Sequence, residues 1–127
     1  INLIPANLIE QAHQTSAKYA EGESEFNAVG LTEEFTEYSK APFVFESPVK
    51  YAMELKEIVP IKFNNTSFVI GAVTGVFIDE QILASDGFLD LEKANIITSL
   101  GIDGYYATEK LARYSYAKPG KELTRID

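Results

Sequence analysis

The stretch that most constrains the fold is FVIGAVTGVFID, residues 68–79. In an extended chain its side chains alternate between two faces, and both faces are apolar. Phe68 and Ile70 would lie on one face, and Val69 and Val73 on the other. A strand that is apolar on both sides has to be covered on both sides. We therefore predict a strand that lies inside a β-barrel or beneath a partner.

Two glycines interrupt this run. Gly71 and Gly75 are four residues apart, so a regular strand would place both on the same face and leave that face without side chains. Glycine weakens a strand interior, so the pair needs a structural reason. A sharp bend of the barrel is the favoured explanation. Close approach of a flat ligand or of another subunit is the alternative, and it stays open at this point.

Two further patterns flank this run. Apolar and mostly polar side chains alternate over residues 49–56, where Val49 and every second residue after it are apolar. This alternation predicts a second strand with one solvent-exposed face, which includes Lys50. The turn-forming residues Asn64–Ser67 would connect the two strands, and the dipeptide Asp86–Gly87 predicts a later turn.

The N-terminal part shows helical signals. The opening INLIP looks like the end of an apolar strand that runs into a helix over residues 5–20, with Pro5 in its first turn. A short helix follows and is ended by Gly30. Residues 31–41 are mostly polar and are expected to form an exposed connection.

Two helices are predicted near the C-terminus. Asp90 is a suitable cap for a helix whose apolar stripe includes Ile97 and which Gly101 and Gly104 would break. A last helix is expected from Tyr105 to Ala117, and its Glu109 and Arg113 are spaced for a surface ion pair.

Composition limits the function classes. A chain of 127 residues with 46% hydrophobic residues can form one domain over residues 1–127 without disulfides. It has no cysteine, so thiolate metal sites and cysteine nucleophiles are excluded. His13 is the only histidine, which excludes a multi-histidine metal site.

Charge and hydropathy limit the partners. The net charge of −8 argues against nucleic acid and anionic membranes, which need a basic surface. No apolar run approaches the roughly 20 residues of a membrane span. We expect a cytoplasmic protein that binds neither nucleic acid nor membrane.

The stretch SLGIDGYYATEKLARYSYAKP, residues 99–119, contains four of the seven tyrosines. Tyrosine has a flat apolar ring with a polar tip, which suits subunit contacts and stacking on planar ligands alike. Packing or a dimer contact is favoured, and a ligand contact is the alternative. No acid, base or nucleophile stands out as catalytic.

The same stretch resembles the C-terminal signature of the flavin reductase-like family of FMN-binding split barrels, in its flavoredoxin branch. Three more stretches are similar to family segments in the same order: residues 1–32, FESPVKYAMEL at 45–55, and FVIGAVTGVFID. The resemblance implies a mainly β fold with helices, an antiparallel FMN-binding split β-barrel. It also implies that the chain is the C-terminal part of such a barrel and lacks its N-terminal strands.

The resemblance suggests cofactor-binding residues position by position. Asn2 matches an asparagine near the flavin, Ser16 matches a Thr-Ser pair in the following helix, and Tyr105 and Tyr106 match the closing aromatic pair. No catalytic residue and no metal is implied. Thr66 lies where one reductase branch carries a Gly-Asp-His motif for the nicotinamide cofactor, and this chain has no histidine there.

The resemblance implies a homodimeric flavoprotein with bound FMN that works as a flavin reductase or as a flavoredoxin-like electron carrier. NAD(P)H is one candidate reductant and a redox protein is another. The alternative is a non-catalytic dimeric barrel that binds flavin or another planar ligand, since a fold does not fix a function.

Overall fold

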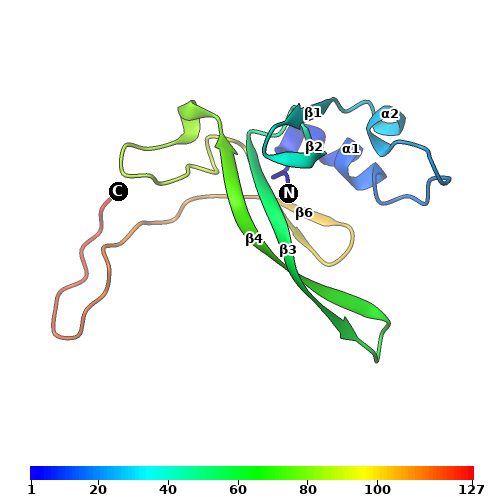
Figure 1. The fold of residues 1–127 in the computed structure, drawn as a ribbon. Helices are drawn as coiled ribbons and strands as arrows, with labels where there is room; N and C mark the ends of the chain where they lie inside the picture. The colour runs from blue at the N-terminus through cyan, green and yellow to red at the C-terminus, as the bar shows by residue number, and fades with distance from the viewer.

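The computed structural model describes all of residues 1–127. The chain contains three antiparallel hairpins and a few short helices (Figure 1). The elements in chain order are η1 (Ala6–Leu8), α1 (Ile9–Gln14), α2 (Glu25–Val29), β1 (Glu33–Thr36), β2 (Ser39–Val44), β3 (Val49–Ile61), β4 (Thr66–Ile78), η2 (Glu80–Ile82), β5 (Ile97–Leu100) and β6 (Gly104–Ala107).

The long hairpin β3–β4 dominates the molecule and confirms the two predicted strands. The expected cover on both faces of β4 is not found within residues 1–127, since no residue of β4 is buried. Val49 pairs with Ile78 at one end, and Ile61 pairs with Thr66 at the other. The chain reverses at the predicted polar turn, where Asn65 has a φ of 56°. Asparagine tolerates this left-handed conformation better than most residues, which explains its place at the tip.

The two glycines of β4 lie beside irregularities in this ladder. The register shifts once next to Gly75, where Thr74 has no partner, and once next to Gly71, where Lys56 of the opposite strand has none. Such bulges bend a strand and increase its twist. The ladder therefore bends where the glycines lie, as the first explanation of the pair requires.

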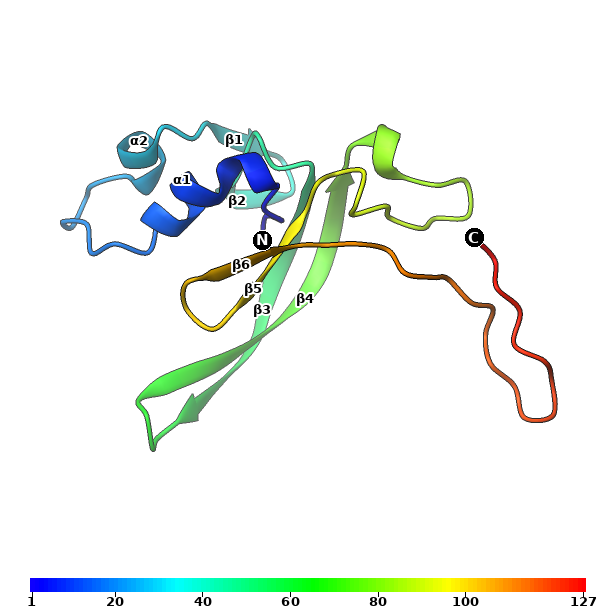
Figure 2. The same ribbon diagram turned by 180° about the vertical axis from the view of Figure 1, so that it is seen from behind.

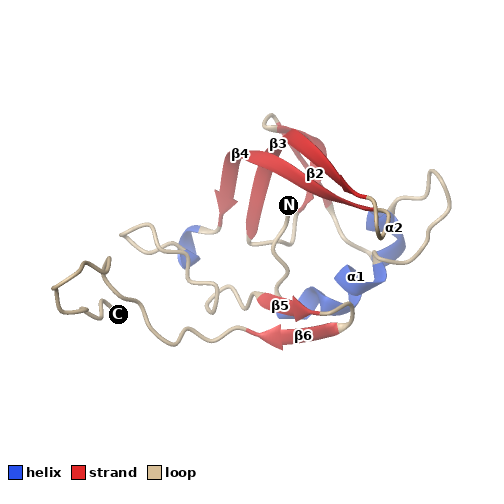
Figure 3. Cartoon of the chain, turned by 90° about the horizontal axis from the view of Figure 1, so that it is seen from below, coloured by secondary structure: helices blue, strands red, loops and turns tan.

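The first five residues join two hairpins. The N–H of Tyr51 donates to the carbonyl of Ile1, and the N–H of Leu3 donates to Val49 in β3. On the other side the N–H of Ile97 in β5 donates to the carbonyl of Ile4. The opening segment thus lies between β3 and β5, with β4 and β6 outside them (Figure 3). The mainly β, antiparallel fold class is confirmed.

Two predictions for the N-terminal part need correction. The first helix ends at Gln14 instead of about residue 20, because the hydroxyls of Thr15 and Ser16 bond back to the carbonyls of Ala12 and His13 and close the last turn. The expected exposed connection over 31–41 is instead the hairpin β1–β2 and its approach. By contrast, α2 ends as predicted at Gly30, which has a φ of 73°.

The two predicted C-terminal helices are absent. After Asp90 the chain makes an irregular turn that ends at Asn95 with a φ of 51°, and the β-branched residues that follow form β5. Tyr105 and Tyr106 lie in β6, paired with Ser99 and Thr98, because pairing across the hairpin overrides local helical spacing. Beyond Ala107 the chain forms no helix, and an isolated antiparallel bridge joins Tyr114 to Arg125 across a turn at residues 119–120.

The expected Glu109–Arg113 ion pair is also wrong, because an extended segment does not bring residues four apart together. Arg113 instead pairs with Asp86 and lies over the ring of Phe88, 4.0 Å from its centroid. This contact fastens the C-terminal segment to the predicted Asp86–Gly87 turn, where Gly87 has a φ of 85°.

The core is small and lies where the hairpins meet. Nine of the 127 residues are buried, and among them Val49 and Ala52 belong to the inner half of β3. The outer half of β3–β4 extends away from the other elements, and its large apolar side chains are exposed (Figures 1 and 2). No helix is long and apolar enough to span a membrane.

Candidate functional site

Tyr105 lies at the centre of the side chains that form the candidate functional site. Its phenolic oxygen is 2.8 Å from Nδ1 of His13 on α1, and the two rings meet edge to face at 84°. Pairing of β6 with β5 fixes the backbone of Tyr105, and the helix ending at Gln14 fixes His13. The contact joins the first helix to the last hairpin.

Tyr105 lines two cavities. One, of about 170 Å³, lies between the opening segment and β5 and is mostly apolar. Its lining consists of Asn2, Leu3, Ile4, Ile96, Ile97, Ser99 and Tyr105. The other, of about 400 Å³, is more open and more polar. It is lined by Ile9, Glu10, His13, Gln14, Asp103 and Tyr105.

The structure brings together two of the four residues that the sequence suggested. Asn2 and Tyr105 line the same cavity, and Oδ1 of Asn2 already accepts a hydrogen bond from the N–H of Val44. Ser16 is exposed at the end of α1, where its hydroxyl donates to the carbonyl of His13. Tyr106 is 54% exposed and adjoins Tyr105 on a strand, so it points to the opposite face.

The lining of these cavities suits part of a flavin. A flat aromatic wall, three isoleucines and a few hydrogen-bonding groups fit a planar ring system. A phosphate group needs cationic or N–H donors, and neither cavity is lined by lysine or arginine. Glu10 and Asp103 make the larger cavity acidic. The cavities therefore fit the ring of a flavin and not its phosphate.

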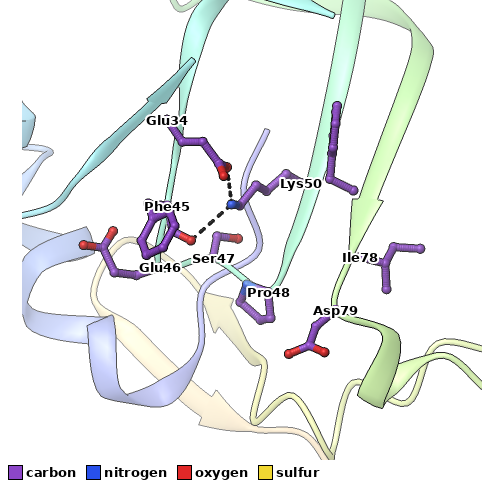
Figure 4. A pocket seen from close by; sticks show the side chains of 9 residues that line it. Glu34, Phe45, Glu46, Ser47, Pro48, Lys50, Ile78 and Asp79 are labelled. Carbon is purple, nitrogen blue, oxygen red and sulfur yellow. Dashed lines mark hydrogen bonds and ion pairs between the residues drawn. The ribbon is translucent and has the colours of Figure 1, made fainter. Parts of the chain in front are cut away.

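A third pocket, of about 350 Å³, surrounds Lys50 where β1, β2 and β3 meet (Figure 4). Nζ of Lys50 is paired with Glu34 of β1 and donates to the carbonyl of Phe45, 3.1 Å away. Lys50 is only 8% exposed, so the prediction that it lies on a wet face is wrong. The cost of burying the ammonium group is offset by its pairing with Glu34, and this ion pair ties β1 to β3.

Glu46 borders the same pocket and supports the same junction. Burial acts to raise its pKa, but the bonds that the N–H of Thr32 donates to its carboxylate outweigh that effect. The charge of Lys50 also favours the ionised form, so the pKa of Glu46 lies below its ordinary value. These groups are engaged with one another, and we interpret this pocket as a structural junction.

Sequence reasoning missed both the His13–Tyr105 contact and the burial of Lys50. The only sequence signal for Lys50 is its position directly after the Ser-Pro-Val stretch, at the start of a strand with apolar neighbours. No signal connects His13 with Tyr105, since they are 92 residues apart and meet through the tertiary fold.

Comparisons with known proteins were made for the whole chain. No family model matches the chain, and no curated protein matches it. Solved structures do match. A flavin reductase with a split barrel domain from Shewanella frigidimarina NCIMB 400 is 45% identical, with a TM-score of 0.86. That match covers 91% of this chain and 59% of that chain.

Two further structures agree with this result. The flavoredoxin of Desulfovibrio vulgaris (Miyazaki F) is 30% identical, with a TM-score of 0.67, over 94% of this chain and 61% of that chain. Nitrilotriacetate monooxygenase component B from Bacillus cereus is 19% identical and has a TM-score of 0.78, over 88% of this chain and 57% of that chain, which shows a shared fold. This chain belongs to the flavin reductase-like split-barrel family.

Proposed function

We propose that this chain is the part of a flavoprotein that holds the ring of FMN, and that the protein transfers electrons through the bound flavin. The observation that supports this most is the shared lining of one cavity by Asn2 and Tyr105, two residues suggested independently by the family resemblance. The similarity to a flavin reductase and to a flavoredoxin supports the same class of function.

The absence of an obvious acid, base or nucleophile fits this proposal. A bound flavin supplies the electron chemistry itself, so the protein has to bind, orient and shield the ring. Tyr105 offers an aromatic wall, and its hydroxyl is held in place by His13. The apolar residues Ile4 and Ile96 on the same cavity would exclude water from one side of the ring.

The phosphate of FMN would be bound by donors outside these two cavities. The chain spans 59% of the length of the flavin reductase from Shewanella frigidimarina, so the remaining length of such a protein, or a second subunit, offers room for those donors. We propose a homodimer in the cytoplasm, in which the exposed apolar half of β3–β4 is covered.

The choice of electron donor rests on the family resemblance, which matches Thr66, at the tip of β3–β4, to the nicotinamide-contacting motif of one reductase branch. Thr66 is exposed there, and its hydroxyl donates to Oδ1 of Asn64, 2.7 Å away. This tip has no histidine to contact a nicotinamide ring. We therefore favour a redox protein as the donor over direct oxidation of NAD(P)H.

The test is anaerobic addition of NADH or NADPH to the purified protein loaded with FMN. Slow or no bleaching of the flavin bands, with fast bleaching by a chemical reductant such as dithionite, is the result expected for a carrier. Rapid bleaching by NADH would instead assign direct reductase activity and contradict the choice of donor, while the flavin site itself would stand.

A further inference from the structure

The last twenty residues form a distinct feature, which we call the arm: residues 108–127. Its base is fastened to the body, since the hydroxyl of Thr108 donates to the carbonyl of Ile96 and Arg113 pairs with Asp86. Beyond Arg113 the arm turns back on itself, with the N–H of Ser115 donating to Thr124. Figures 1 and 2 show the arm projecting away from all three hairpins.

The arm exposes apolar side chains that no other part of residues 1–127 covers. Tyr116 is 88% exposed. The other exposed large apolar side chains of the arm are Leu111, Tyr114, Leu123 and Ile126. A projecting segment with this many exposed apolar groups is typical of an interaction surface.

Charge indicates what the arm contacts. The arm contains five basic and three acidic residues, and its stretch 110–121 contains four of the basic residues and no carboxylate, namely Lys110, Arg113, Lys118 and Lys121. Residues 19–39, which we call the acidic segment, contain six glutamates and neither lysine nor arginine. The glutamates are Glu21, Glu23, Glu25, Glu33, Glu34 and Glu37. Opposite charges of this kind steer association and fix its register.

These two charged regions do not meet within one chain. The acidic segment, which includes α2 and β1, lies at the opposite end of the molecule from the arm (Figure 1). Of its six glutamates only Glu34 has a cationic partner, which is Lys50. Lys118 and Lys121 of the arm have no carboxylate within 4.0 Å. The acidic segment also presents apolar rings, with Phe35 and Tyr38 exposed.

We infer that the arm of one copy docks on the acidic segment of a second copy. Each chain carries one arm and one acidic segment. In a closed two-fold dimer the same contact therefore forms twice, and each arm and each acidic segment has a partner of opposite charge. An unrelated acidic protein would satisfy the arm and leave the acidic segment without a partner. This inference rests on the proposed homodimer and adds a pair of charged contacts to the apolar contact proposed for the outer half of β3–β4.

The test is a charge exchange in the purified protein, with the dimer dissociation constant measured by analytical ultracentrifugation. The first variant, Lys118→Glu/Lys121→Glu, reverses two positive charges on the arm. The second variant, Glu21→Lys/Glu37→Lys, reverses two negative charges at exposed positions of the acidic segment. The control, Lys93→Glu, reverses one exposed charge that lies outside the arm, the acidic segment and the hairpin β3–β4.

Each of the two variants alone is expected to raise the dissociation constant by at least about tenfold, while the control changes it by less than about threefold. An equimolar mixture of the two variants is expected to regain wild-type affinity, because both contacts in the mixed dimer again join opposite charges. Raising the salt concentration should weaken the wild-type dimer, and the control dimer should weaken to a similar extent.

Three outcomes would overturn the inference. A dimer as tight in the arm variant as in wild type would show that the arm docks elsewhere, with the homodimer intact. Weakened dimers that the mixture does not restore would show that the arm contacts another surface. A wild-type protein that stays monomeric up to about 100 μM would remove the homodimer as well. Flavin binding is measured separately and is decided by none of these results.

Discussion

Nδ1 of His13 lies 2.8 Å from the phenolic oxygen of Tyr105, so the only histidine of the chain fixes one of its most suggestive tyrosines. The contact joins α1 to β6 and determines the orientation of a ring that lines two cavities.

Tyr105→Phe is expected to keep the aromatic wall and lose the hydrogen bond. Because the bond is exposed, unfolding free energy should fall by no more than about 1 kcal/mol, measured by urea denaturation. FMN affinity should change little. Tyr105→Ala removes the wall and should weaken FMN binding by about tenfold or more. Equal affinity in all three proteins would show that Tyr105 does not contact the flavin.

Lys50→Met is expected to destabilise the fold, because it leaves Glu34 without its cation in a half-buried position. We expect a loss of about 1–3 kcal/mol in unfolding free energy, discounted because Glu34 is partly solvated. Lys56→Met is the matched control, since Lys56 pairs with Glu54 on an exposed surface and should cost less than about 1 kcal/mol. Similar losses in the two variants would contradict the structural role of Lys50.

The lowered pKa of Glu46 predicts a pH dependence of stability. Although burial opposes it, hydrogen bonding from Thr32 makes the folded pKa lower than the ordinary value of 4.5. The contribution to stability is complete above that value and is lost as the pH falls through the folded pKa. Unfolding free energies measured from about pH 6 to about pH 3 should fall less steeply in Glu46→Gln than in wild type. Parallel curves would show that Glu46 is not involved.

The two glycines of β4 can be separated by single substitutions. A Cβ on Gly75 would lie 3.7 Å from Cβ of Ala52, an ordinary contact, so Gly75→Ala should leave the melting temperature unchanged or slightly higher. A Cβ on Gly71 would lie 2.9 Å from Cε of Met53, which has to move, so Gly71→Ala should be the less stable variant. If both variants fold well but lose FMN or dimer affinity, the open alternative of a close ligand or subunit contact would replace the bend.

The sequence predicted the parts of the fold that follow from local alternation and turn chemistry. The doubly apolar run and the polar turn at Asn64–Ser67 specified β3–β4, and Gly30 specified the end of α2. These signals depend on residues that are neighbours in the chain, so no tertiary information was needed.

The failed predictions share a different cause. The helix expected from Tyr105 to Ala117 was argued from spacing, but Tyr105 and Tyr106 gain partners in β5 that the sequence does not reveal. Lys50 was assigned to the wet face because charge normally indicates exposure, and only the position of Glu34 across the hairpins makes its burial acceptable. In the candidate site, the family resemblance identified Asn2 and Tyr105, whereas the contact of His13 with Tyr105 is revealed only by the structure.

The most direct measurement is a titration of the purified protein with FMN, followed by its visible absorption and by quenching of flavin fluorescence. We expect saturable binding near one FMN per chain, with a dissociation constant in the micromolar range or below that Tyr105→Ala raises. Absence of saturable binding up to about 1 mM FMN would contradict the proposed flavin function and leave the split-barrel fold alone.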